Sequence, residues 1–333
     1  MKRVSLIMLV LCLLLGGCTQ IRENKQYNIT YLDLFDTVTT IVCSGDSEEQ
    51  FRQDAQTIYQ QLQVYHRLFD IYNDYEGINN LKIVNDHAGI APVVVESAII
   101  ELLLDCKEYY ELTDGKVNAA MVSILRLWHE ARTQGIEDPK NAKLPDKEAL
   151  ILAAEHISFD SIVIDEKAST VYISDPATSL DVGAIAKGWA CQKVAETAPA
   201  GMLISVGGNV CATGPKDTDG TPWVVGIQNP DGGDYLRKIS ITGGAVVTSG
   251  DYQRTYTVDG KQYHHIIDPE TGIPSTYWRS VTVICNDSAL ADALSTALFV
   301  MPLEEGKALA KECGAKVLWL DAEGKQYTTE DVW

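Results

Sequence analysis

Apolar residues recur along this chain with two different spacings, and each spacing predicts its own kind of element. Spacings of three and four residues, typical of helices, occur throughout the first half and again near the C-terminus. Alternating or short continuous apolar runs, typical of strands, dominate the second half. The predicted helices are residues 47–66, 93–112, 117–133, 184–197 and 288–301. The predicted strands are residues 29–43, 157–164, 169–173, 201–206, 222–228, 236–242, 245–249 and 279–285, with a helix and a hairpin from residue 303 to the end.

The order of these elements indicates the fold class. Helices around many antiparallel strands predict an α+β fold with a mixed, mainly antiparallel sheet core and flanking helices, and not a doubly wound nucleotide-binding sheet. The pair Asp259-Gly260 predicts the turn of a hairpin within this series. The polar stretch 133–145 is long enough to divide two subdomains.

The first residues have the pattern of a targeting signal. Lys2 and Arg3 precede an apolar run, residues 4–15, that is too short for a membrane-spanning helix. The run ends in Gly16-Gly17-Cys18, which resembles the cleavage site of bacterial lipoproteins, although an ordinary secretory signal or a short anchor has a similar pattern. We therefore expect removal of residues 1–17, lipidation of Cys18, a tether at residues 18–27 and a folded domain at residues 28–333. Such a protein is extracytoplasmic and lipid-anchored to the cell membrane.

Charge and cysteine usage narrow the classes of partner. The formal net charge is −19, and it becomes −21 when Lys2 and Arg3 leave with the signal. This balance disfavours nucleic acid and anionic membrane surfaces and suits a cationic cofactor, although solubility alone accounts for most of it. Beyond Cys12 and Cys18, the cysteines lack CxxC spacing and most lie among apolar residues, so buried thiols fit better than a zinc site. Disulfides remain open outside the cytoplasm.

Two glycine-containing segments follow predicted strands. In Asp181-Val182-Gly183-Ala184-Ile185-Ala186-Lys187-Gly188, Gly183 permits close approach and Lys187 lies in the first turn of a helix, where free N–H groups favour an anion. The segment suits a phosphorylated ligand, but a helix cap with a solvated lysine fits equally well. Ser205-Val206-Gly207-Gly208-Asn209 lacks the lysine of a Walker loop, so a tight turn is its simpler interpretation.

An acid and a hydroxyl are four residues apart on the apolar helix near the C-terminus. Asp292 and Thr296 therefore project from one face. A carboxylate with a hydroxyl suits Mg²⁺ better than zinc. The alternative is local: Asp292 interacts with the helix dipole, and Thr296 bonds back to its own helix.

The densest polar pattern is the run from His264 to Gly272, which follows Thr248-Ser249-Gly250-Asp251-Tyr252. Pro269 and Gly272 predict a turn that a preceding strand holds in place. Neighbouring side chains of a strand point to opposite faces, so the two histidines cannot chelate one metal together. We expect one histidine to be a general base and His264 to face away as a surface residue.

Taken together and in this order, five segments resemble those of the ApbE family, the FAD:protein FMN transferases. They are Asp181–Gly188, Ser205–Asn209, Thr248–Tyr252, His265–Gly272 and Leu290–Thr296. The resemblance covers nearly the whole mature chain and implies an ApbE-like (T-fold-like) catalytic domain. It also implies a reaction in which the FMN moiety of FAD passes to a threonine hydroxyl of an acceptor flavoprotein through a phosphoester bond, and AMP is released.

Carried over by matching position, the resemblance implies residue roles. The Mg²⁺ ligands would be the backbone carbonyl of Ala184, the carboxylate of Asp292 and the hydroxyl of Thr296. His265 would be the base for the acceptor hydroxyl. The implied FAD contacts are Phe35, Tyr72, Val117, Asn118, Ala119, Asp181, Lys187, Ile266 and Ile267. The acceptor would be an extracytoplasmic flavoprotein with a threonine-containing motif. Phosphoryl transfer needs positioning and charge neutralisation, which Mg²⁺ supplies.

The sequence departs from the family at two places. Phe35-Asp36-Thr37 stands where many members have Met-Gly-Thr, and Asn118-Ala119-Ala120 stands where relatives have an Asp-x-Thr pattern. These departures concern flavin packing and not the metal site, and Phe35 and Tyr72 could equally be core aromatics. Two other functions remain open: an FAD pyrophosphatase that gives FMN and AMP, and a non-catalytic flavin-binding lipoprotein.

Overall fold

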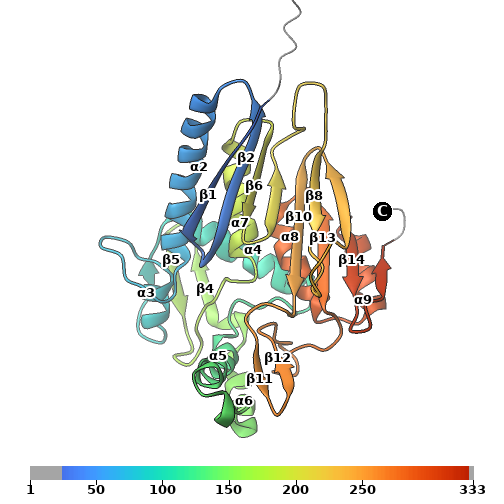
Figure 1. Ribbon diagram of the computed structural model, residues 1–333. Coiled ribbons are helices and arrows are strands. Elements are labelled where there is room, and N and C mark those ends of the chain that lie inside the picture. The colour runs from blue at the N-terminus through green and yellow to red at the C-terminus, as the bar shows by residue number, and fades with distance from the viewer. Residues whose placement is uncertain (1–24, 330–333) are drawn as a thin grey trace, which may run out of the picture.

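The main feature of the fold is an eight-stranded sheet in which every neighbouring pair of strands is antiparallel (Figure 1). It is seen in a computed structural model that describes residues 25–329. The strand order is β1-β2-β6-β7-β10-β13-β14-β15. These strands are β1 (Lys25–Leu34), β2 (Thr37–Gly45), β6 (Met202–Val206), β7 (Asn209–Ala212), β10 (Gly244–Gly250), β13 (Ser280–Cys285), β14 (Lys316–Leu320) and β15 (Gln326–Thr328). The α+β class with a mainly antiparallel core is confirmed.

Three smaller sheets and eight α-helices complete the described part of the chain. The smaller sheets are β3 (Val93–Val94), β5 (Thr170–Ile173) and β4 (Ile162–Asp165); β8 (Trp223–Ile227) and β9 (Arg237–Ile241); and β11 (Tyr256–Val258) and β12 (Lys261–Tyr263). The helices are α2 (Glu48–Phe69), α3 (Leu81–Asp86), α4 (Ser97–Leu112), α5 (Val122–Glu137), α6 (Lys147–Ala153), α7 (Ala186–Thr197), α8 (Ser288–Phe299) and α9 (Leu303–Glu312). Short 3-10 helices lie at Pro139–Asn141, Ala154–His156 and Phe159–Ser161.

The two faces of the large sheet are covered differently. On one face, apolar side chains of α2 and α7 pack against Ile41, Ile204 and Cys211 of the sheet. On the other face, the β8–β9 hairpin places Trp223 and Ile241 against side chains of β7 and β10. Successive residues of a strand point to opposite faces. Because both faces of this sheet are covered, its strands carry apolar residues at successive positions. Buried strands of this kind read as continuous apolar runs, as predicted for residues 245–249.

Helix α8 is apolar on nearly every side because it lies between α7 and the strands β10 and β13. Asp287 caps it by accepting the Leu290 N–H at 2.9 Å. Ten of its residues are buried, including Asp292 and Ser295. The fold therefore holds a carboxylate and a hydroxyl inside an apolar layer.

A separate apolar cluster joins α5 to the β11–β12 hairpin, and it includes Trp128, Tyr256 and Ile267. In Figure 1, α5, α6, β11 and β12 lie together at one end of the molecule. The expected polar loop at 133–145 is wrong in its first part, because α5 continues to Glu137. Ala142 packs against the same cluster, so this stretch is not a free linker.

Other boundaries also differ from prediction. The single strand predicted at 29–43 is a hairpin, with Phe35 and Asp36 at positive φ (53° and 52°) in a two-residue turn between β1 and β2. Strand β7 was not predicted as a strand, and residues 93–96 precede α4 instead of belonging to it. Because β1 begins at Lys25, residues 25–27 belong to the domain and not to the tether. Residues 1–17, Cys18 and the start of the tether lie outside the described residues. Within residues 25–329, no helix is both long and apolar enough to cross a membrane.

Candidate active site

The buried carboxylate of Asp292 is the meeting point of three elements. The backbone N–H of Gly188, at the start of α7, donates to Oδ2 at 2.8 Å, and Asn209 Nδ2 of β7 donates to the same oxygen at 3.0 Å. The ammonium of Lys187 lies 3.7 Å from it. Asp292 is 3% exposed, and burial raises the pKa of its carboxyl while Lys187 and the two donors oppose that shift. The carboxylate is thus held in one orientation, and Oδ1 receives no hydrogen bond from residues 25–329.

A glycine is required where α7 crosses α8. A Cβ at Gly188 would lie 2.3 Å from the Ser288 carbonyl oxygen and 2.4 Å from Asp292 Cβ. The absence of a side chain lets the N-terminus of α7 approach the carboxylate closely enough for the hydrogen bond. A carboxylate at a helix N-terminus is also favoured by the helix dipole.

The segment before α7 forms a tight polar turn. Asp181 Oδ1 accepts the Gly183 N–H at 2.7 Å, and Lys187 Nζ donates to the Gly183 carbonyl at 2.8 Å. The Gly188 N–H is used by Asp292, and the Ala184 carbonyl accepts no hydrogen bond from any residue in the described range. The Ala184 carbonyl and Asp292 Oδ1 therefore both lack a donor among residues 25–329.

Thr296 lies one helical turn after Asp292 and is partly exposed. The neighbouring Ser295 is buried: its hydroxyl donates to the Asp292 carbonyl at 2.9 Å and lies 2.8 Å from Ser249 Oγ. Ser295 therefore joins α8 to Ser249 of β10, and the hydroxyl of Thr296 takes no part in that contact.

The segment Val117-Asn118-Ala119 lies beside the Asp181 turn, because the Asp181 N–H donates to the Ala119 carbonyl at 2.8 Å. All three residues are buried. The amide of Asn118 donates to the Ile157 carbonyl and accepts the Ala120 N–H, both at 2.8 Å. The Asn118 side chain thus holds its own loop.

The two histidines carry their protons in a defined way. His264 Nδ1 accepts the Ile266 N–H at 3.2 Å, so its Nε2 donates to the Ser275 carbonyl at 2.8 Å. His265 Nδ1 lies 3.2 Å from the Gln253 carbonyl, which can only accept, so Nε2 of His265 carries the free lone pair. Burial and then the charge of Arg254 lower the pKa of His265 to about 3, with Lys187 contributing. His265 is therefore a neutral imidazole at pH 7.

Two expectations about the histidines are wrong. Residues 264–266 are not in a strand, since β12 ends at Tyr263 and only Ile267 forms an isolated bridge, with Pro274. His264 is not a surface residue: its ring packs edge-on against Phe299 at 5.5 Å between ring centroids, and burial lowers its pKa. The turn from Asp268 to Gly272 is confirmed by the Gly272 N–H, which donates to the Asp268 carbonyl at 2.8 Å.

The remaining predicted flavin contacts differ in exposure. Ile266 and Ile267 are 6% and 5% exposed and belong to different apolar clusters. Tyr72 is 64% exposed, and its pKa is raised, first by burial of part of its side chain and then by the charge of Asp181. Phe35 packs against His66 at the tip of the β1–β2 hairpin.

Two residues that the sequence did not indicate as partners of Asp292 donate hydrogen bonds to it, Gly188 and Asn209. Asn209 was assigned to a tight turn, and its amide in fact orients Asp292. The turn itself is confirmed, with Gly207 and Gly208 at φ 60° and 92° between β6 and β7. Nothing in the sequence distinguishes Gly188 from the rest of the segment Asp181–Gly188. A polar residue directly after a glycine turn was the signal for Asn209.

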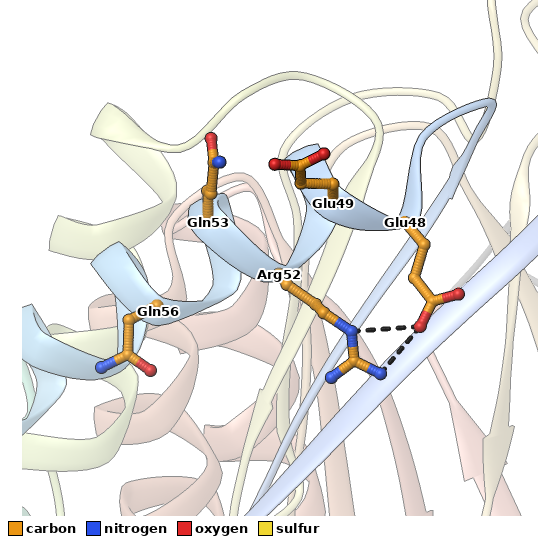
Figure 2. A pocket seen from close by; sticks show the side chains of 5 residues that line it. All are labelled: Glu48, Glu49, Arg52, Gln53 and Gln56. Atoms are coloured by element: carbon orange, nitrogen blue, oxygen red, sulfur yellow. Dashed lines mark hydrogen bonds and ion pairs between the residues drawn. The ribbon is translucent and has the colours of Figure 1, made fainter.

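The surface also has a depression on the outer side of α2, lined by Glu48, Glu49, Arg52, Gln53 and Gln56 (Figure 2). Arg52 and Glu48 form an exposed ion pair at 2.7 Å there. None of the predicted site residues lines this depression, so it is not part of the group around Asp292.

Comparison with known proteins agrees with this arrangement. The sequence model of the ApbE family matches residues 26–319. The chain belongs to the ApbE family. A relative from Treponema pallidum named FAD:protein FMN transferase is 30% identical over 329 residues, which are 93% of this chain and 88% of the relative. A relative of the same name from Klebsiella pneumoniae is 31% identical over 260 residues, 74% of this chain and 78% of the relative.

Solved structures of ApbE proteins have the same fold. The ApbE protein of Thermotoga maritima superposes with a TM-score of 0.80 and 30% identity, over 92% of this chain and 97% of that one. The flavin transferase ApbE of Vibrio cholerae gives a TM-score of 0.76 over 92% of this chain and 98% of that one, and at 24% identity it supports the fold alone. The ApbE-like architecture expected from the five segments is confirmed.

Proposed function

We propose that this chain is an FAD:protein FMN transferase that works on an acceptor flavoprotein. In the reaction, a threonine oxygen of the acceptor forms a bond to the FMN phosphorus of FAD. The bond between that phosphorus and the bridging oxygen of the pyrophosphate breaks, and AMP leaves with the bridging oxygen. The threonine proton passes to a base. The family and the names of the relatives support the reaction.

The observation that carries the proposal is the oriented, buried carboxylate of Asp292 beside Lys187. Phosphoryl transfer depends on fixed charges close to phosphate oxygens in a site with little water. Here a carboxylate, an ammonium and the N-terminus of α7 converge within hydrogen-bonding or ion-pair distance. Lys187 supplies a positive charge that suits a phosphate oxygen.

Mg²⁺ fits the oxygens at this position. Asp292 Oδ1, the Ala184 carbonyl and the Thr296 hydroxyl are hard ligands, and neither Asp292 Oδ1 nor the Ala184 carbonyl receives a hydrogen bond from residues 25–329. When bound, the ion supplies neutralisation of pyrophosphate charge. Among the described residues there is no group of three His, Cys, Asp or Glu side chains that could hold a metal. The proposed Mg²⁺ ligands are one carboxylate, one backbone carbonyl and one hydroxyl, so they are not a group of this kind.

His265 is the proposed base. Its Nε2 lone pair is free because Nδ1 is directed at the Gln253 carbonyl. Without substrate its basicity is low because the ring is buried and because Arg254 and Lys187 are nearby. A bound pyrophosphate brings negative charge next to the same two cations and so raises the affinity of Nε2 for a proton. The base thus gains strength when the substrate is present.

The nine predicted FAD contacts and the anchoring are part of the proposal. Val117, Asn118 and Ala119 would contact FAD mainly through the backbone, since the Asn118 amide is already engaged. We infer that Tyr72, Asp181, Phe35, Ile266 and Ile267 surround the flavin portion. The N-terminal segment supports removal of residues 1–17, lipidation of Cys18 and action outside the cytoplasm. We infer from the family that the acceptor presents a threonine-containing motif.

The test is labelling of an acceptor. The chain without residues 1–17 is incubated with FAD, Mg²⁺ and candidate flavoprotein domains, and flavin fluorescence is measured in a denaturing gel. Asp292→Asn should lower the rate by about three orders of magnitude, as expected for loss of several kcal/mol of charge stabilisation. Asp105→Asn is the matched control, because Asp105 is a half-buried carboxyl whose pKa is likewise raised by burial and which accepts from Trp189 of α7 at 2.7 Å. Free FMN without a labelled acceptor would indicate the pyrophosphatase, and tight FAD binding without either product would indicate a passive binder.

A further inference from the structure

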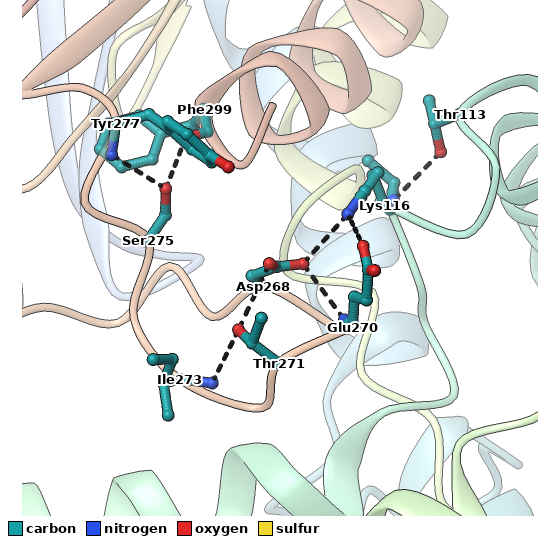
Figure 3. Close-up of polar contacts among 10 residues, drawn as sticks. Thr113, Lys116, Asp268, Glu270, Thr271, Ile273, Ser275, Tyr277 and Phe299 are labelled. Atoms are coloured by element: carbon teal, nitrogen blue, oxygen red, sulfur yellow. Dashed lines mark hydrogen bonds and ion pairs between the residues drawn. The ribbon is translucent and has the colours of Figure 1, made fainter. Parts of the chain in front are cut away.

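We propose that Lys116 is a positioning residue that fixes the distance between two walls of the flavin site, and this rests on the proposed function. One wall is the Val117–Ala119 segment, which directly follows Lys116. The other is the segment His265–Ile267, which directly precedes the Asp268–Gly272 turn. Lys116 is the cross-link between them (Figure 3). None of the five family segments includes it.

The cross-link is a three-residue ion cluster. Lys116 Nζ lies 2.7 Å from Glu270 Oε2 and 3.4 Å from Asp268 Oδ1. The Glu270 N–H in turn donates to Asp268 Oδ1 at 3.1 Å. The side chains of Lys116 and Asp268 are 16% and 12% exposed, whereas Glu270 is 76% exposed. The contact with Asp268 is therefore partly shielded from solvent, and Glu270 forms its outer edge.

Lys116 is itself held rigidly on the first wall. Its N–H donates to the Thr113 carbonyl at 3.1 Å, at the end of α4. The hydroxyl of Thr113, which is buried, accepts the Val117 N–H at 3.1 Å and donates to Tyr109. Figure 3 shows Thr113 and Lys116 on one side and the Asp268 turn on the other. The position of the Lys116 ammonium is thus coupled to the position of the Val117–Ala119 backbone.

The second wall is also held by other hydrogen bonds, but these do not reach the first wall. Trp128 Nε1 of α5 donates to the Gly272 carbonyl at 2.8 Å, and the Ser275 hydroxyl donates to the Phe299 carbonyl at 2.8 Å. These bonds attach the turn to α5 and α8. Of the hydrogen bonds and ion pairs in the described chain, those of Lys116 are the ones that join the turn to the 116–119 segment.

This geometry predicts a particular kinetic effect. A wall that contacts bound FAD equally before and during the reaction changes KM, while kcat stays the same. Lys116→Met keeps the length and apolar stem of the side chain and removes the charge, so KM for FAD should rise about tenfold with kcat changed less than about twofold. Lys116→Arg retains both ion pairs and should restore KM. Lys107→Met is the control, because Lys107 forms an exposed pair with Glu111 at 4.0 Å on α4.

Two measurements separate this inference from the proposed function. The first is steady-state labelling with varied FAD, and the second is FAD binding followed by flavin fluorescence without acceptor. The positioning role is supported if the KM and the dissociation constant for FAD are both tenfold higher in Lys116→Met while kcat is unchanged. Lys116→Arg and Lys107→Met should have the same values as the wild-type chain. Unchanged FAD affinity in Lys116→Met overturns it, whether or not the variant melts earlier. If the wild-type chain binds FAD but labels no acceptor, the proposed transferase activity is wrong. The FAD affinity of Lys116→Met relative to the wild-type chain still decides the role of Lys116. If the wild-type chain does not bind FAD, both are overturned.

Discussion

Replacement of Gly188 by alanine tests whether close contact between α7 and α8 creates the site. The added Cβ would lie 2.3 Å from the Ser288 carbonyl oxygen, and this oxygen is backbone, so it cannot rotate away. An ordinary carbon–oxygen contact is about 3.4 Å, so the helices must separate by about 1 Å. The Gly188 N–H bond to Asp292, now 2.8 Å, would then exceed the length of a hydrogen bond.

The magnitude follows from three contributions. Overpacking of a buried contact costs about 1–3 kcal/mol, and loss of a hydrogen bond to a charged group costs about 1.5–3 kcal/mol. Alanine in place of glycine inside a helix returns about 1 kcal/mol. The expected net loss in the free energy of unfolding is roughly 1.5–5 kcal/mol, and labelling should fall with it because Asp292 loses its orientation.

Urea denaturation gives the free energy of unfolding, and acceptor labelling gives the activity. Gly306→Ala is the control, since a Cβ on this glycine of α9 would approach only side-chain atoms, at 3.3 Å from Leu298 and Trp319. Its stability should change by less than about 1 kcal/mol. If Gly188→Ala is as stable and as active as the wild-type chain, the account of the α7–α8 contact is refuted.

Three further outcomes are expected. Asn209→Leu keeps the volume but removes a donor to Asp292, so labelling should fall about 10- to 100-fold; an unchanged rate in the gel assay would show that the amide does not orient the carboxylate. Because the pKa of His265 is about 3 in the folded chain and lies below that of an unfolded histidine, its neutral form stabilises the fold above pH 6.5 and this stabilisation is lost as the pH falls towards 3. Urea midpoints measured from pH 7 to 4 should therefore decline less steeply for His265→Asn than for the wild-type chain, and parallel curves would contradict the assignment. Exhaustive treatment with EDTA should stop labelling until Mg²⁺ is restored. If labelling continues after chelation, the proposal that Mg²⁺ binds at Asp292 is wrong.

Much of the architecture follows from apolar spacing. Helix α8 and strand β10 were predicted within two residues of their bounds, because long apolar runs that pack on several sides leave a strong pattern. The β1–β2 turn was missed because Phe35 and Asp36 are not glycine or asparagine, so no local signal marks two positive φ angles. Strand β7 was missed because four residues after a glycine pair carry too little pattern.

The site could be predicted only in part. Asp292 and Thr296 share a helical face, so their sequence spacing revealed them. The partners of Asp292 could not be found this way, since Gly188 and Asn209 reach it from 104 and 83 residues away in the chain. Likewise, a histidine pair looks like a strand pattern in sequence, while the carbonyls of Gln253 and Ser275 decide where each ring points.

The wide separation in sequence of the groups around Asp292 links ligand occupancy to the folding equilibrium. An unfolded chain has no preformed site, because α7, β7 and α8 come together only in the native state. A cation or nucleotide held there binds the folded form alone, and at a hundred times its dissociation constant it stabilises that form by about 2.7 kcal/mol. The melting temperature of the protein thus becomes a measure of ligand concentration, and a titration monitored by unfolding reports on affinity without any turnover.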